Sequence, residues 1–133
     1  NWNNTVTAED TVFVLGDFAF NKGYKSVLNG NVILLKGNHD SVKPKPCIES
    51  IKIRNEGHTF HLTHKPEHAD PCMVTLCGHV HQFWKILWIG GFPIINVGVD
   101  VWDFTPVSME RINAFICDET QKHLKEVGCV STI

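Results

Sequence analysis

The chain has 133 residues, of which 12 are Lys or Arg and 14 are Asp or Glu, so its formal net charge is −2. This balance excludes a polyanion-binding surface spread over the whole domain, and we expect no strong general nucleic-acid surface. Hydrophobic residues make up 43% and charged residues 20% of the chain, which excludes a disordered protein. The length fits a single domain, residues 1–133, with one main core.

Neither a membrane span nor a disulfide framework is indicated. The longest nearly apolar stretch, residues 86–95, is too short to cross a bilayer and contains two glycines and a proline. The five cysteines form no C-x-x-C pair, which favours buried, reduced thiols and a cytoplasmic protein. They are Cys47, Cys72, Cys77, Cys117 and Cys129.

Short apolar runs rich in Val, Ile and Leu predict strands rather than helices. In chain order these runs cover residues 11–15, 31–35, 47–54, 58–63, 73–77, 85–89 and 93–97. Residues 22–28 predict a short helix that ends at Asn29-Gly30. Glu56-Gly57 predicts a hairpin turn between two of the runs, and Gly90-Gly91 predicts a second one.

Residues 108–127 have a helical period instead. Ser108 fits an N-cap, Gly128 fits a stop, and an interruption is expected near Asp118. The apolar positions that repeat along one face are Met109, Ile112, Ile116, Leu124 and Val127. Because no linker is visible, the sequence predicts one α/β domain rich in strands, with the last helix packed on a sheet.

Four of the predicted strands end in glycine, at Gly16, Gly37, Gly78 and Gly98. In the first three, a possible ligand follows at once: Asp17, Asn38 and His79. Ligands of α/β folds gather outside the carboxyl ends of strands, so these three side chains are expected to converge. The alternative is that the glycines only permit sharp turns.

Histidine is concentrated in the same region, because seven of the eight histidines lie between His39 and His81. Such a cluster points to metal or acid–base chemistry. A carboxylate can bridge two cations, while imidazoles and an amide oxygen serve as neutral ligands. Two ions held in this way form the site used for phosphoester cleavage, and a set of N and O donors suits Mn, Fe or Zn.

The motifs Gly16-Asp17, Gly37-Asn38-His39-Asp40 and Gly78-His79-Val80-His81, with a lone His64 between the last two, closely resemble the calcineurin-like metallophosphoesterase family. Residues 96–102 and 106–108 are similar to a small bacterial, archaeal or phage branch of it. The resemblance covers residues 12–109. It implies a four-layer α/β/β/α sandwich of two mixed β-sheets and a metal-dependent hydrolase acting on a phosphomonoester or phosphodiester.

The resemblance also implies a role for each matching residue. Two divalent metal ions are expected, with Mn first and Fe, Zn or Ni as alternatives, and the substrate is a small phosphoester such as a nucleotide. The implied metal ligands are a bridging Asp17, then Asn38, His64 and His79 at one site, and His81 at the other. His39 would protonate or stabilise the leaving oxygen while a metal-activated hydroxide attacks phosphorus, and Asp40 would orient His39.

One motif of the family is missing. The family opens with D-x-H, yet no histidine precedes His39, and only Asp17 and His81 remain for the first metal. Because the sequence starts without Met, we expect an upstream strand and helix that carry this motif. The alternative is a broken dinuclear site in a non-catalytic metal-binding or protein-interaction scaffold. The serine/threonine phosphatase branch fits poorly, since residues 18–21 read Phe-Ala-Phe-Asn where that branch has x-x-D-R.

Several residues have two interpretations. His61 is an alternative to His64 as the lone ligand, and Pro66 favours His64. Asn96 and Asp100 either border the site or satisfy turn amides. Side chains expected to face solvent are His58, Lys65, His68 and His123, and aromatics expected in the core or at an edge are Trp84, Trp88, Trp102 and Phe104.

Overall fold

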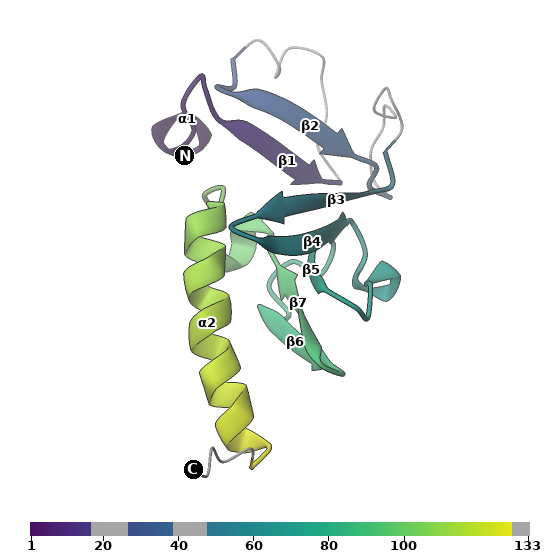
Figure 1. The fold of residues 1–133 in the computed structure, drawn as a ribbon. Helices are drawn as coiled ribbons and strands as arrows, with labels where there is room; N and C mark the ends of the chain where they lie inside the picture. The colour runs from purple at the N-terminus through teal and green to yellow at the C-terminus, as the bar shows by residue number, and fades with distance from the viewer. Residues whose placement is uncertain (17–26, 39–47, 129–133) are drawn as a thin grey trace.

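The structure, a computed structural model, describes residues 1–16, 27–38 and 48–128 (Figure 1). Within them the chain forms strands and one long helix, α2, preceded by a single-turn helix, α1. The elements in chain order are α1 (Trp2–Thr5), β1 (Thr11–Leu15), β2 (Asn31–Leu35), β3 (Ser50–Asn55), β4 (His58–Thr63), η2 (Pro66–His68), β5 (Val74–Cys77), β6 (Ile86–Ile89), β7 (Phe92–Asn96), η3 (Val99–Val101) and α2 (Met109–Glu126).

The strands form two sheets. β1 and β2 make a two-stranded parallel sheet, and the other strands make a five-stranded mixed sheet in the order β3-β4-β5-β7-β6. Figure 1 shows the two-stranded sheet above the larger one, with α2 running alongside the latter. The α/β class and all seven predicted strands are confirmed, with ends that differ by up to three residues. The sequence did not predict α1.

One face of the five-stranded sheet supplies most of the core. Strand register places Leu62 beside Ile51, and Leu76 beside both Leu62 and Ile95. Alternate residues of a strand share a face, so these apolar side chains lie together. The buried cluster, which joins both sheets and α2, consists of Leu15, Leu35, Phe60, Leu62, Leu76, Ile95, Trp102 and Ile112.

Both predicted hairpins are present. β3 and β4 pair antiparallel around Glu56 and Gly57, whose φ angles are 49° and 81°. Two successive residues with positive φ are what a two-residue hairpin loop requires, because its twist matches that of the strands. β6 and β7 also pair antiparallel, and Gly90-Gly91 connects them.

α2 begins where the sequence predicts. The Ser108 hydroxyl accepts a hydrogen bond from the Arg111 backbone N–H at 3.1 Å, and Gly128 after the helix has a φ of 72°. The expected interruption near Asp118 is wrong, because the helix continues through it. The Asp118 side chain is 72% exposed and lies 3.8 Å from the Lys122 amine one turn later, so it does not disturb the packed face. Most of the helix predicted over residues 22–28 lies outside the described residues.

The N-cap offers a test of this local structure. Replacing Ser108 by Ala should lower the free energy of unfolding by about 1 kcal/mol, because the first turn loses the acceptor for one backbone N–H. Ser108→Asp should preserve stability, since its carboxylate can accept the same bond and favours the positive helix end. Urea unfolding of the three proteins measures the difference. Equal stability of Ser108→Ala and the original protein would contradict the proposed cap.

The described cysteines are only partly as expected. Cys77 is buried, but Cys72 and Cys117 are exposed, so the prediction of buried thiols is wrong for these two. Cys72 lies in the exposed loop before β5, and Cys117 lies on a side of α2 whose neighbouring residues Ala114, Asp118 and Gln121 are also exposed. Burial raises the pKa of the Cys77 thiol to about 12, which keeps it protonated and a poor metal ligand. Cys47 and Cys129 lie outside the described residues.

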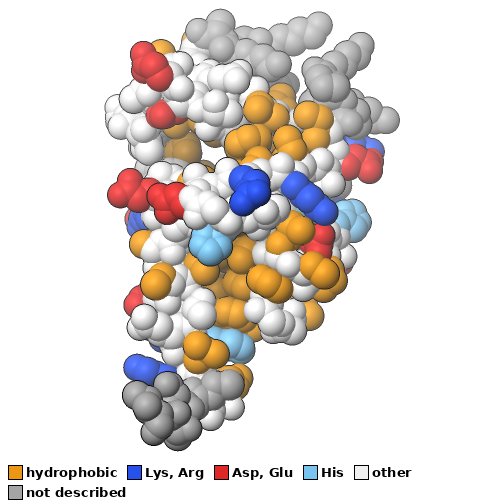
Figure 2. Space-filling view, viewed as in Figure 1, with side chains coloured by type: hydrophobic (Ala, Val, Ile, Leu, Met, Phe, Trp, Pro, Cys, Tyr) orange, Lys and Arg blue, Asp and Glu red, His pale blue; other side chains and the backbone are white. Residues whose placement is uncertain are grey.

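The surface gives two further findings. In Figure 2, basic and acidic side chains of the described residues are interspersed on the visible face, with no continuous basic patch. None of the described helices is both long and apolar enough to cross a membrane.

Candidate metal centre

The carboxyl ends of four strands meet at one place. A Cβ added to Gly16, directly after β1, would lie 2.7 Å from the Cα of Gly37, which follows β2. The same Cβ would collide with the His64 ring after β4. The Gly78 backbone N–H, directly after β5, donates to the His64 carbonyl at 3.0 Å. The glycines therefore do more than permit turns, because they let strands from both sheets approach one histidine.

His64 is held inside this junction. It is 4% exposed, and its Nδ1 lies 2.7 Å from the Leu15 carbonyl oxygen. A carbonyl oxygen can only accept, so Nδ1 carries a proton, and in the neutral ring Nε2 carries the lone pair. That Nε2 lies 2.6 Å from the Asn38 Oδ1. With the amide oxygen facing Nε2, two lone pairs meet that a cation could share; with the amide turned over, its N–H would donate to Nε2 in an ordinary hydrogen bond.

His79 adds a third predicted ligand beside this pair. Its ring centroid lies 4.9 Å from that of His64, with the two rings at 74° to each other. The backbone of His79 has a φ of 70°, and that of His81 has a φ of 48°. Residues other than glycine seldom adopt this left-handed conformation, and the residues that do adopt it are often found at functional sites. The tertiary structure thus brings together Asn38, His64 and His79.

A buried amide fixes the loop that carries His79 and His81. Asn96 is fully buried, and its Nδ2 donates to the carbonyl oxygens of His81 at 2.6 Å and Trp84 at 2.9 Å. Its Oδ1 accepts from the Gly98 N–H at 2.8 Å. Asn96 therefore joins the loop after β5 to the turn after β7. The sequence left open whether Asn96 borders the site or satisfies turn amides, and its bond to the Gly98 amide confirms the second interpretation. The two carbonyl partners were not predictable, because they are distant in the chain.

His81 is more exposed than His64 and has a different polar neighbour. Its side chain is 63% exposed, and its Nδ1 lies 3.4 Å from the Oδ2 of Asp100. Asp100 belongs to η3, the short turn that follows Gly98. Both residues, with His64 and His79, line a largely apolar cavity of about 600 Å³ between β1, the five-stranded sheet and the start of α2. A ligand held by these histidines would therefore be in contact with this cavity.

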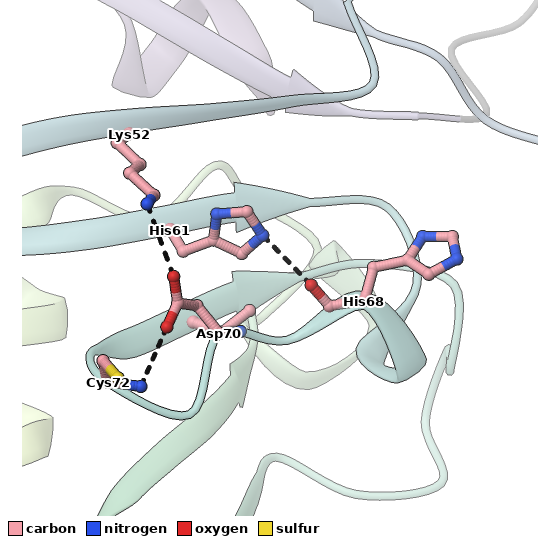
Figure 3. A network of polar contacts seen from close by, with 6 residues as sticks. Lys52, His61, His68, Asp70 and Cys72 are labelled. Carbon is pink, nitrogen blue, oxygen red and sulfur yellow. Dashed lines mark hydrogen bonds and ion pairs between the residues drawn. The ribbon is translucent and has the colours of Figure 1, made fainter.

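The alternative histidine, His61, lies in a different network (Figure 3). An odd spacing of three residues along β4 puts His61 and His64 on opposite faces of the strand. The His61 Nε2 lies 3.1 Å from the His68 carbonyl oxygen, while its buried Nδ1 has no hydrogen-bond partner in the described part of the chain. The structure therefore does not bring His61 to the junction of strand ends.

The same network includes an ion pair on the outer side of the sheet. The Lys52 amine lies 3.4 Å from the Asp70 carboxylate, which also accepts the Cys72 backbone N–H at 2.8 Å (Figure 3). This backbone hydrogen bond is the main reason why the pKa of Asp70 lies below its usual value. These contacts order the segment after His64 but add no ligand to the centre.

Other side chains differ in part from expectation. His58 and His68 are exposed, as predicted. The prediction that His123 faces solvent is wrong, because its half-buried ring stacks on Trp88 with ring centroids 3.9 Å apart. Trp102 is buried, as expected, and donates from Nε1 to the Asn96 carbonyl. Phe104 is 64% exposed, so its expected packing is wrong. It sits in a left-handed turn, with a φ of 56°, that directs it away from the core.

Three predicted site residues, Asp17, His39 and Asp40, lie outside the described residues. Within residues 1–16, 27–38 and 48–128, no group of three or more His, Cys, Asp or Glu side chains could hold a metal. The junction instead offers two imidazoles and one amide oxygen, a set that a neighbouring carboxylate would complete. The donor types fit a divalent cation that takes N and O ligands.

Comparison with known proteins relates the chain to two others. It is 31% identical over 125 residues to the uncharacterized protein MJ1445 of Methanocaldococcus jannaschii. That match covers 84% of this chain and 69% of MJ1445. It is also similar to a solved structure, the protein of unknown function AQ665 from Aquifex aeolicus, with a TM-score of 0.66 and 26% identity. That match covers 87% of this chain and 81% of the other. No protein-family model matches the chain.

Proposed function

We propose that this chain, which belongs to the family of the uncharacterized protein MJ1445, is a metal-dependent phosphoesterase. Its substrate would be a phosphodiester or a phosphomonoester, and its reaction a hydrolysis. The observation that carries the proposal is the approach of Asn38 Oδ1 and His64 Nε2 to 2.6 Å, with the His79 ring beside them. A junction that gathers one amide and two imidazoles at strand ends is suited to a cation that takes N and O ligands.

The proposed ligand sets follow from this arrangement and from the family resemblance. Asn38, His64 and His79 would hold one ion, His81 would bind a second, and Asp17 would bridge the two. Mn is the first choice, with Fe, Zn or Ni as alternatives, since the donors are nitrogen and oxygen. The neutral Cys77 thiol would not compete, because burial raises its pKa to about 12.

In the bound state, the metal ions would activate water at neutral pH and neutralise charge on the phosphate. The chain's own residues would do the remaining work. His39, which is not assigned to a metal, would donate a proton to the leaving oxygen, and Asp40 would orient its imidazole. The Leu15 carbonyl, by holding Nδ1–H of His64, keeps the Nε2 lone pair directed toward Asn38.

We further propose that the fold is a four-layer α/β/β/α sandwich. The described residues supply two sheets that share a buried cluster, and one helical layer, α2, beside the larger sheet. The strands end in a common region, as a site between two sheets requires. The second helical layer is part of the proposal only.

Metal removal tests the proposed function. The protein should bind Mn²⁺ and hydrolyse bis(p-nitrophenyl) phosphate, and a chelator should reduce turnover to background by at least about 10²-fold, because the ions stabilise the transition state by several kcal/mol. Added Mn²⁺ should restore turnover. Calorimetry measures the binding, and absorbance of the released phenolate measures turnover.

The possible outcomes separate the two functions considered. Metal binding without turnover of mono- or diesters would favour the non-catalytic scaffold over the enzyme. A protein that binds no divalent ion at micromolar concentration would contradict both the enzyme and the metal-binding scaffold.

A further inference from the structure

The His81 ring is not held in place by burial. Its side chain is 63% exposed and projects from a backbone with a φ of 48°. A ring in this setting can rotate about its side-chain bonds and exchange the proton between its two nitrogens unless a polar neighbour restrains it. The neighbour in the structure is Asp100, whose Oδ2 lies 3.4 Å from Nδ1.

The backbone segments that carry His81 and Asp100 are held next to each other by a buried side chain. The fully buried Asn96 amide holds the His81 carbonyl at 2.6 Å and the Gly98 N–H at 2.8 Å. Gly98 starts the η3 turn that contains Asp100, and the Val101 N–H donates back to the Gly98 carbonyl at 3.2 Å. One side chain therefore fixes the backbone on both sides of the pair.

His64 has an equivalent arrangement. There a backbone carbonyl, that of Leu15, accepts from Nδ1 at 2.7 Å and leaves Nε2 as the lone-pair nitrogen. The Asp100 carboxylate lies farther from Nδ1 of His81, at 3.4 Å, but acts in the same direction, because an ionised carboxylate accepts a hydrogen bond and has none to donate. Metal-binding histidines are typically oriented in this way by an acceptor on the second nitrogen.

We infer that Asp100 is a positioning residue for His81: its carboxylate selects the Nδ1–H tautomer, turns the ring, and leaves Nε2 as the donor atom for a divalent cation. The part of this inference that concerns a cation rests on the proposed function. The part that concerns the tautomer and the ring does not, since it depends only on the contact between two side chains of this chain. Asp100 would thus orient the ring of His81 through Nδ1, as the Leu15 carbonyl orients the ring of His64.

The first experiment uses the metal-free protein at a pH where histidine is neutral. Long-range ¹H–¹⁵N spectra distinguish the protonated ring nitrogen of each histidine. We expect Nδ1–H to dominate at His81 in the original protein and Nε2–H to dominate in Asp100→Ala. Asp100→Asn should be intermediate, because its amide oxygen is an uncharged acceptor. The control is Asp103→Asn, three residues away, whose 80% exposed carboxylate pairs with Arg111 instead.

A His81 tautomer that is the same in Asp100→Ala and in the original protein would overturn the inference, whatever the protein does with metals. A change in Asp100→Ala that Asp103→Asn also produces would overturn it too, since the effect would then come from surface charge in general.

The second experiment measures affinity for Mn²⁺. Removal of an orienting partner of a metal-bound histidine typically weakens the metal 10- to 100-fold, so Asp100→Ala should raise the dissociation constant of the weaker site by about that factor. Asp103→Asn should leave it unchanged. If the original protein binds no Mn²⁺, the proposed function fails while the tautomer result stands by itself. If Mn²⁺ binds equally to Asp100→Ala, the role of Asp100 toward the cation is overturned.

Discussion

Replacement of His64 by alanine is expected to lower phosphodiester turnover by on the order of 10³-fold or more, with loss of the metal ion at that site. The reason is that His64 is the residue on which the junction of strand ends converges. Its Nε2 faces Asn38, its ring lies against His79, and its Nδ1 binds the Leu15 carbonyl. Without the ring, the proposed metal ion loses one of its ligands, and Asn38 and His79 alone should hold it less tightly. Turnover of bis(p-nitrophenyl) phosphate and Mn²⁺ calorimetry measure both effects.

The matched control is His58→Ala, at the exposed start of the same strand, which should keep both turnover and metal. Because His64 is 4% exposed, its removal also deprives the buried Leu15 carbonyl of this donor, at a cost of about 1–3 kcal/mol. His64→Gln, which keeps a polar side chain of similar reach, covers the case in which His64→Ala does not fold. A folded variant of either kind that retains full turnover would contradict the proposed centre.

Replacement of Gly16 by alanine is expected to reduce the free energy of unfolding by about 3 kcal/mol. Two costs add. A φ of 85° is unfavourable for a residue with a Cβ by about 1–2 kcal/mol, and overpacking typically costs about 1–3 kcal/mol more. The added methyl would meet the His64 ring and, at 2.7 Å, the Cα of Gly37. Backbone atoms cannot move aside as a flexible side chain can.

Gly57→Ala separates the two costs. Gly57 has nearly the same φ, 81°, but an added Cβ there meets nothing within 4 Å. This variant should therefore show only the conformational cost, about 1 kcal/mol. Denaturant unfolding of both variants gives the difference, and Mn²⁺ affinity should fall only in Gly16→Ala, because only that variant displaces His64. Equal destabilisation of the two variants would show that the close approach of β1, β2 and His64 is not required.

The strands and turns were predictable because their signals are local. The β-branched runs that form β1 and β2, the Glu56-Gly57 turn and the Ser108 cap each depend on residues within a few positions of one another. The continuity of α2 through Asp118 was not predictable in this way. An acidic residue in mid-helix weakens the pattern, but its exposed side chain and its Lys122 neighbour leave the helix intact.

Pairings between distant segments had weaker signals. Nothing in the sequence near Asn96 shows that its amide reaches the carbonyls of His81 and Trp84, since those partners are 15 and 12 residues away, respectively. The contact of Asp100 with His81 is of the same kind. His123 has no neighbour in the sequence that predicts a ring beneath it, and its stacking on Trp88 depends on where α2 crosses the sheet.

By itself, then, the sequence determined the α/β class, the strand positions and the start of α2, because those signals are local. Residue type, strand-ending glycines and the family resemblance together named Asn38, His64, His79 and His81 among the candidates. Tertiary structure alone decided which of these side chains meet. It placed Asn38, His64 and His79 at one junction, directed His61 to the opposite face of β4, and set Asp100 beside His81. The physical reason is that such contacts depend on sheet register and on backbone close enough to exclude a Cβ, and both arise only when the two sheets pack together.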